Sequence, residues 1–400
     1  MDTTKNTHSL STIKMVILLA YISGGSVSAA IITPALPLIK KMFLLDDGSV
    51  EWIVSIFLIG YVIGQLIYGP LANRYGRLVS LRSGLILNLF GVFVCLMSTW
   101  AHSFHLLLVG RLVSALGAAA GLSCTFMLIS ELLTIEQAKH ALSYTMVSFT
   151  VGIGLSVAIG GVFAEYLHWQ DCFWVLALHG VAMLILTWQF KETLKSPQPL
   201  SINNLLQGYR RVLKNPILIS FSVILGVCAG VSYCYSAAAP IISHVLLKLN
   251  PSEYGYWNLV TLLGMLGSGL LSAELMKRYT PKNIVFYSLI ALFVCLLSLV
   301  GLAVSHQENI IWFFLSAMLL FLFSGLLFPS ASFCASNACE DKASASSMMS
   351  FLNMLSATLS VIIMGYLPVT ALWALIIVLG SFFLLALILC GLFSRSVQSC

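Results

Sequence analysis

Charged residues are scarce in this sequence. Only 8% of the 400 residues are charged, whereas about 25% are charged in a typical soluble domain. Hydrophobic residues make up 59% of the chain. Because a soluble fold needs charged and polar groups over much of its surface, this composition excludes an ordinary water-soluble protein.

Motifs of several chemistries are also missing from the sequence. It has no glycine-rich loop with a lysine to hold a nucleotide phosphate, and no Cys or His spacing of a zinc site. No Ser or Cys nucleophile has a base at a recognised spacing, and the ten cysteines are scattered. We therefore expect no ATP-driven motor, no metal, no cofactor and no enzyme.

Long apolar runs fill most of the chain. Each is long enough to cross about 30 Å of hydrocarbon as a helix. Lipid offers the backbone no hydrogen bonds, and the runs lack the alternation of barrel strands, so we predict an all-α integral membrane protein. The twelve predicted transmembrane helices are 13–41, 50–71, 80–101, 104–132, 139–163, 171–190, 216–244, 254–276, 283–304, 309–335, 343–366 and 369–393.

Lysine and arginine are distributed unevenly between the predicted loops. If the N-terminus is cytoplasmic, sixteen of the 20 basic residues lie on the inner side, three lie on the outer side and Arg111 lies within a span. This bias predicts two cytoplasmic termini in a bacterial inner (cytoplasmic) membrane. Because topology accounts for the net charge of +6, we expect the lipid bilayer as a partner and no nucleic acid.

The spans fall into two groups of six. We predict an N-terminal six-helix bundle at 1–190, a cytoplasmic linker at 191–215 and a C-terminal six-helix bundle at 216–400. The pair Arg74-Tyr75 after the second span recurs as Arg278-Tyr279 after the eighth. Such parallel repeats are typical of transporters that bind substrate between the halves near mid-membrane.

Residues 69–77, "GPLANRYGR", form a charged turn between two apolar runs. This turn resembles the cytoplasmic loop signature of the major facilitator superfamily. The whole chain, over about 13–393, is most similar to its Bcr/CflA-like drug-resistance (drug:proton antiporter) group. The resemblance implies the major facilitator fold and a cytoplasmic latch between the two halves. The predicted latch residues are Gly69, Asn73, Arg74, Gly76 and Arg77.

Each latch residue has an expected physical role. Gly69 would allow close helix approach, Gly76 would supply a tight turn, and the arginines would anchor at the inner surface. Asn73 stands where the family has an acid, which implies a weaker latch. The alternative is a simple positive-inside turn. The nearby "KETL" (191–194) also resembles the central loop of the drug-resistance group.

"GRLVSALGAAAG" (110–121) resembles the arginine motif of the family's fourth span. Arg111 is predicted to lie about 10 Å inside the span and to face the bundle interior, because an unpaired charge in lipid costs about 2.5 kcal/mol or more. Backbone carbonyls loosened by "SGGS" (23–26) are the expected partners. The alternative is that Arg111 snorkels to the interface.

"TVGIGLSVAIGGVF" (150–163) resembles the fifth-span glycine motif of exporters. Gly152, Gly160 and Gly161 match it, whereas Ser156-Val157 replaces the usual Gly-Pro step. Small residues let helices pack closely in lipid. Ordinary helix packing explains the motif as well as an export function does.

The acid that the drug-resistance group carries in its first span is replaced by Ala30. The remaining acids lie in loops or at span ends, and we take Glu131 as the best-buried acid and the candidate for proton coupling. A structural role for Glu131 is the alternative. With Ala30 and Asn73 where acids are expected, the coupling ion stays open.

Polar, aromatic and methionine side chains on the predicted cavity-lining spans are candidates for substrate binding. Packing is the alternative role for each of them. Together with Arg111, they favour a neutral or anionic ligand. The candidates are Arg111, Ser26, Tyr61, Gln65, Tyr144, Phe149, Tyr233, Tyr235, Asn258, Asn353 and Met354.

These patterns favour a secondary active transporter that moves a small organic solute by alternating access. The resemblance favours an exporter of a drug, metabolite or siderophore, acting as a monomer. The alternatives are an importer or facilitator of a carboxylate metabolite or siderophore, and a non-transporting membrane sensor with the same fold. The sequence does not identify the substrate, the direction or the oligomeric state.

Overall fold

The computed structural model describes residues 11–133, 135–194, 196–197, 210–211, 213–305, 307–338 and 342–393. Within these ranges, some side chains lie outside the description: those of residues 47, 130, 135–147, 273, 277, 336–337, 342–347 and 393.

Every regular element in the described ranges is a helix, and twelve helices there are long and apolar enough to cross a membrane. The predicted all-α membrane fold with twelve spans is therefore confirmed. The elements are α1 (Thr12–Ala30), η1 (Thr33–Ala35), α2 (Leu36–Met42), α3 (Asp47–Tyr75), α4 (Arg77–Trp100), α5 (Phe104–Leu132), α6 (Ile135–Tyr166), α7 (Asp171–Leu186), η2 (Thr187–Gln189), α9 (Pro216–Val245), α10 (Pro251–Arg278), α11 (Pro281–Ser305), α12 (Ile310–Asn337), α13 (Lys342–Gly365) and α14 (Ala371–Phe393).

The first span is broken after Ala30, where α1 ends and the short helix η1 begins. Pro34 has no N–H, so it cannot donate the helical hydrogen bond to the carbonyl of Ala30. The hydroxyl of Thr33 donates to that carbonyl instead, at 2.8 Å. The proline therefore accounts for the break.

The segment "SGGS" (23–26), by contrast, is regular helix within α1, so the expectation that it loosens the backbone is wrong. Its glycines serve packing. A Cβ on Gly25 would lie 2.6 Å from the ring of Tyr61, and one on Gly24 would lie 3.6 Å from His179. The absence of side chains here lets α3 and α7 approach α1 closely.

The chain divides into two compact units. The first unit holds Met1–Ala29, Gly60–Ile153 and Phe173–Leu200, and the second holds Ala30–Ile59, Gly154–Cys172 and Ser201–Cys400. The predicted linker at 191–215 lies largely outside the described residues, so the predicted division at that linker stays a prediction.

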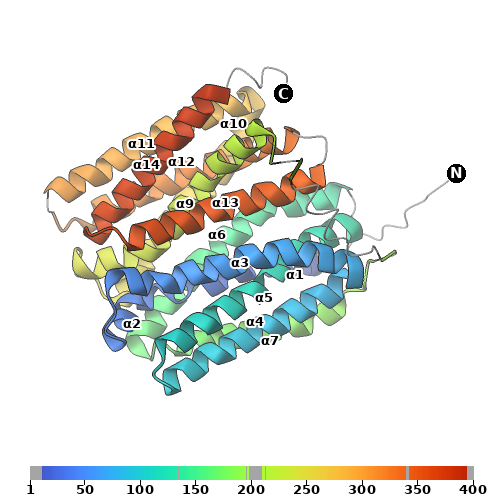
Figure 1. Ribbon diagram of the computed structural model, residues 1–400, viewed down its shortest axis with the longest axis horizontal. Coiled ribbons are helices and arrows are strands. Elements are labelled where there is room, and N and C mark those ends of the chain that lie inside the picture. The colour runs from blue at the N-terminus through green and yellow to red at the C-terminus, as the bar shows by residue number, and fades with distance from the viewer. Residues whose placement is uncertain are drawn as a thin grey trace. The chain divides into compact units, whose positions relative to one another are not determined.

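Glycines bring α4 and α5 together in the first unit, where the two helices lie side by side (Figure 1). A Cβ on Gly84 would lie 2.8 Å from the carbonyl oxygen of Gly117, and one on Gly91 would lie 2.8 Å from that of Gly110. In the second unit, α9 packs against α12, α13 and α14. Each unit thus has its own helical core.

Candidate functional site

Arg111 lies inside the first unit and is only 1% exposed. Its helix, α5, begins at Phe104 after Ser103, whose hydroxyl accepts a hydrogen bond from the amide of Leu106. Arg111 lies seven positions after Phe104, which places the arginine about 10 Å along the helix. The predicted inward orientation is confirmed, and this burial is incompatible with snorkelling.

One partner of Arg111 is a backbone carbonyl of α1. Its Nη1 atom donates to the carbonyl of Ser28 at 2.7 Å. Within a continuous helix the amide of residue 32 would bind that carbonyl, but α1 ends at Ala30, which leaves the carbonyl available. A carbonyl of the first span was predicted as the partner, but the break after Ala30 supplies it rather than "SGGS".

Side chains of neighbouring helices hold α1 and α5 in place around this contact. The side-chain amide of Asn88 on α4 donates through its Nδ2 atom to the carbonyl of Ser114 on α5 at 2.7 Å. Tyr21 on α1 donates its hydroxyl to the carbonyl of Met183 on α7 at 2.9 Å. These hydrogen bonds, one buried and one part-buried, hold in place the helices that position Arg111.

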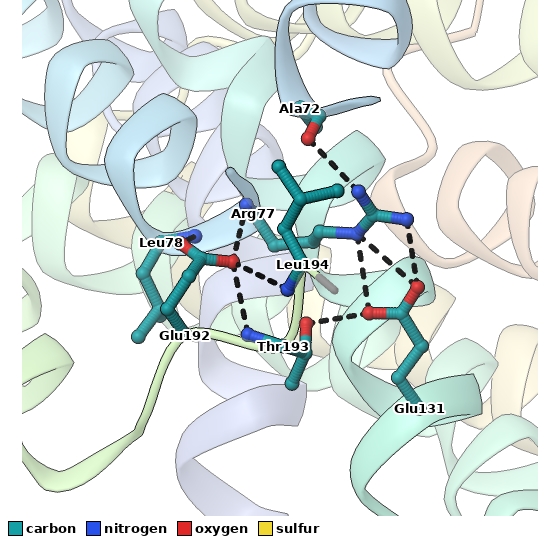
Figure 2. Close-up of polar contacts among 7 residues, drawn as sticks. All are labelled: Ala72, Arg77, Leu78, Glu131, Glu192, Thr193 and Leu194. Carbon is teal, nitrogen blue, oxygen red and sulfur yellow. Dashed lines mark hydrogen bonds and ion pairs between the residues drawn. The ribbon is translucent and has the colours of Figure 1, made fainter. Parts of the chain in front are cut away.

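A second polar cluster lies where α3, α4 and α5 meet the segment after η2 (Figure 2). Arg77 forms an ion pair with Glu131 at 2.8 Å and donates to the carbonyl of Ala72 at 3.0 Å. The hydroxyl of Thr193 donates to the same carboxylate. We call Arg77, Glu131, Glu192 and Thr193 the Arg77 cluster.

Glu192 binds the N-terminus of α4 within the Arg77 cluster (Figure 2). Its carboxylate accepts the amides of Arg77 at 2.9 Å and Leu78 at 3.0 Å, which have no acceptor within the helix. Partial burial raises the pKa of Glu192, but the amides of Leu194, Arg77, Leu78 and Thr193 outweigh burial and hold the pKa below its usual range. Glu192 therefore acts as a charged cap for α4.

Gly76 makes room for this cap. Its φ of +115° is readily adopted only by glycine, and a Cβ there would lie 2.8 Å from Cδ of Glu192. The predicted tight turn at Gly76 is confirmed. Glu192 and Thr193 were missing from the predicted site, although the "KETL" resemblance contained both residues.

The other predicted latch residues contribute less to the Arg77 cluster. A Cβ on Gly69 would meet nothing within 4 Å among the described residues, so the close helix approach expected at Gly69 stays a prediction. Asn73 is half-buried and Arg74 is exposed. A latch between the two halves stays a prediction for all five residues.

Glu131 is more exposed than predicted. Its side chain is 31% exposed, whereas that of its partner Arg77 is 13% exposed. Among the acids whose side chains the structure describes, Glu51 is the buried one, at 4%, and it lies in the second unit against Gly365. The sequence placed Glu51 at a span end and did not single it out. Proton coupling by Glu131 stays a prediction.

The candidate cavity residues of the first unit have different environments. Ser26 and Tyr61 are buried, whereas Gln65 and Phe149 are half-buried. The buried Oε1 atom of Gln65 has no hydrogen-bond partner in the described part of the chain. Tyr144 lies on α6, but its side chain is outside the described residues.

In the second unit, Tyr235, Asn258 and Asn353 are buried, whereas Tyr233 and Met354 are half-buried. The Tyr235 hydroxyl and the Oδ1 atoms of Asn258 and Asn353 have no hydrogen-bond partner among the described residues. Tyr235 also stacks on Phe313, with 6.1 Å between ring centroids. A buried polar atom without a hydrogen-bond partner costs folding free energy. These three oxygen atoms are therefore candidates for hydrogen bonds with solvent or with a solute.

In the described part of the chain, twelve helices are long and apolar enough to cross a membrane, and Arg111 is buried within one of them, which defines a polytopic membrane protein. The family comparison is more specific. Residues 17–361 match the model of the Major Facilitator Superfamily. The chain therefore belongs to this superfamily of solute transporters.

Individual relatives differ in their described roles. An uncharacterized transporter of Rickettsia felis is 25% identical over 315 residues, covering 75% of this chain and 76% of that protein. The arabinose-proton symporter of Escherichia coli is 33% identical over 158 residues, covering 39% and 32%. An MFS-type efflux pump of Mycosarcoma maydis is 29% identical over 182 residues, covering 46% and 28%.

The fold is also that of solved transporters. The crystal structure of a D-xylose-proton symporter superposes with a TM-score of 0.77, covering 96% of this chain and 97% of the symporter. The two sequences are 14% identical, so this likeness concerns the fold alone.

Proposed function

We propose that the protein exports a small organic solute, neutral or anionic, from the cytoplasm of a bacterium by alternating access. The observation that carries this proposal is the position of Arg111, buried in α5 and hydrogen-bonded to the end of α1. Within the superfamily, the Bcr/CflA-like resemblance favours a drug, metabolite or siderophore exporter.

The charge distribution in the first unit supports an anionic or neutral solute. The Ser28 carbonyl that accepts a hydrogen bond from Arg111 is a neutral group. Glu131 lies 20 residues further along α5, a separation of about 30 Å in an α-helix. A carboxylate or a polar neutral molecule would therefore be favoured near Arg111, and a multivalent cation would be repelled.

The second unit supplies uncharged polar groups. The unpartnered atoms of Tyr235, Asn258 and Asn353 could bind hydroxyl, amide or carboxyl groups of a solute. Neighbouring aromatic rings, such as Phe321 at 5.2 Å from Tyr235, could pack against its apolar part. We therefore assign Tyr235, Asn258 and Asn353 to substrate binding as part of the proposal.

Import coupled to protons is the second candidate. The similarity to the arabinose-proton symporter favours it, whereas the efflux pump of Mycosarcoma maydis and the fifth-span glycines favour export. A carboxylate metabolite or siderophore would suit either direction, because Arg111 can bind a carboxylate in both cases.

Purified protein in liposomes tests the proposal. Vesicles would be loaded with a mixture of anionic, neutral and cationic metabolites, and the contents compared with protein-free vesicles over time, with and without a proton gradient. We expect anionic or neutral solutes to move, and the gradient direction that drives them to identify export or import. Selective movement of cations, or no movement of any solute, would contradict the proposal.

A further inference from the structure

At one end of the second unit, helices from the two sequence halves pack closely. The last part of α6 lies on the start of α10, where a Cβ on Gly255 would lie 3.1 Å from both the Cα atom of Ala158 and the carbonyl oxygen of Val157. Gly161 lies directly against the carbonyl of Pro251. The helices α6 and α10 therefore touch through their backbones.

The same end of this unit has a second contact of this kind. A Cβ on Gly48 of α3 would lie 2.7 Å from the carbonyl oxygen of Gly365 at the end of α13. The indole N–H of Trp52 donates to the hydroxyl of Tyr366 at 2.9 Å. In both places a segment that precedes residue 191 packs on a helix that follows residue 215.

One charged residue bridges the α6–α10 contact. The Oε2 atom of Glu165 on α6 accepts the amide of Ser252 at 2.9 Å and also the hydroxyl of Ser252. Ser252 is 2% exposed and lies in the first turn of α10, where amides lack acceptors within the helix and the dipole favours negative charge. Such charge-assisted hydrogen bonds are about twice as strong as neutral ones.

The helix α10 also has a cap of its own. Glu253, in the same first turn, accepts the amide of Asn250 at 2.8 Å. Pro251 at the first helical position further favours a helix start there. Because α10 carries these signals within its own sequence, the bond from Glu165 serves mainly to hold α6 on α10.

We propose that Glu165 is the latch of a gate formed by α6 and α10, and that it must release Ser252 for this end of the protein to open. The inference rests on the proposed alternating access, in which the two sequence halves separate at one end and then at the other. The glycine contacts provide shape complementarity, whereas Glu165 provides a directional, breakable bond. Glu165 is thus a positioning residue for transport.

Cysteine labelling tests this latch without a known solute. A Gly255→Cys reporter is covered by Ala158 while the gate is closed, and a membrane-impermeant maleimide measures how often it opens. We expect Glu165→Ala to raise the labelling rate about tenfold, which corresponds to about 1.4 kcal/mol, and Glu165→Gln to raise it less because an amide oxygen still accepts. Labelling unchanged by Glu165→Ala would overturn the latch.

Glu253→Gln is the matched control, because it weakens the cap of α10 but leaves Glu165 in place. We expect its labelling rate to stay within about twofold of the reporter alone. An equal increase in both variants would show that Glu165 only caps α10. If the Gly255→Cys protein folds poorly, Ala158→Cys reports on the same contact from α6.

A disulfide separates this proposal from the proposed function. Oxidation of an Ala158→Cys/Gly255→Cys pair should stop transport, and reduction should restore it. Transport that continues with the disulfide formed would overturn the gate. Absence of transport before oxidation would contradict the proposed function, while the labelling rates would still decide the latch.

Discussion

At the scale of single residues, the buried Arg111 illustrates how a membrane protein retains an interior charge. The cost of burial is offset by a carbonyl that the break in the first span makes available. Pro34 causes the break, and the break provides the hydrogen bond. The burial of Arg111, within the apolar helix α5, thus depends on Pro34, which lies in another helix.

Replacing Arg111 by alanine should lower transport at least tenfold without preventing membrane insertion, because the solute loses its charged contact. Uptake into vesicles and the amount of folded protein in the membrane measure the two effects. Lys214→Ala, at an exposed lysine before α9, is the control and should transport normally. Full activity of the Arg111 variant would remove this residue from the binding site.

The sequence was sufficient to find Arg111, because one arginine within a long apolar run is conspicuous. It was insufficient for Glu51 and Glu192, which lie near span ends where acids are ordinary. The buried side chain of Glu51 lies against Gly365, and the carboxylate of Glu192 binds the amides of α4. Both depend on residues more than 100 positions away, which no local pattern reveals.

At the scale of helices, α4 depends on a cap supplied by another segment. Glu192→Gln should lower the unfolding free energy by about 1 kcal/mol, because the amide binds the helix N-terminus without charge. The folded-state pKa of Glu192 lies below its ordinary value of 4.5, so its contribution is complete above pH 4.5 and is lost as the pH falls through the lower folded-state value.

Thermal unfolding in detergent, measured at pH 7 and at values below 4.5, checks this prediction. The difference between wild type and Glu192→Gln should be largest at pH 7 and should shrink as the pH falls. Glu308→Gln alters an exposed pair with Lys248 and should change stability little at either pH. A difference that grows in acid would show that Glu192 is not an anionic cap.

Helix packing in the second unit predicts opposite effects for two glycines. A Cβ on Gly160 would collide with the carbonyl oxygen of Ile31, whereas one on Gly269 would meet no described residue within 4 Å. Gly160→Ala should therefore destabilise by more than about 1 kcal/mol. Gly269→Ala should be neutral or stabilise by up to about 1 kcal/mol, since alanine favours the helix. Equal unfolding temperatures for the two variants would contradict this packing.

The spans themselves were predictable from hydrophobicity, because a membrane helix needs a run of fixed length. The break after Ala30 was not predicted, and loosened carbonyls were expected at "SGGS" instead, since glycine is a weak helix former in isolation. In the folded protein, Tyr61 packs against Gly25 and the helix stays intact. Propensity was overridden by contacts between helices.

At the scale of the whole molecule, Glu131 has two candidate roles, one in holding the structure together and one in proton coupling. Its ion pair with Arg77 and its exposure favour a structural role. We expect Glu131→Gln to reduce transport several-fold by weakening the Arg77 cluster, while the pH dependence of transport is retained. Vesicle transport between pH 5 and 8 measures both properties. A flat pH profile would instead assign the coupling proton to Glu131.

Which ends of the helices face the cytoplasm is also a prediction at this scale. The lysine and arginine bias predicts that Arg74, at the end of α3, lies inside the cell and that Lys248, between α9 and α10, lies outside. In sealed cells, an impermeant maleimide should label Lys248→Cys and leave Arg74→Cys unmodified until the membrane is permeabilised. Both positions have exposed side chains, so only the membrane can prevent the maleimide from reaching a cysteine there. Labelling of Arg74→Cys in sealed cells would contradict this topology and place the end of α3 outside the cell.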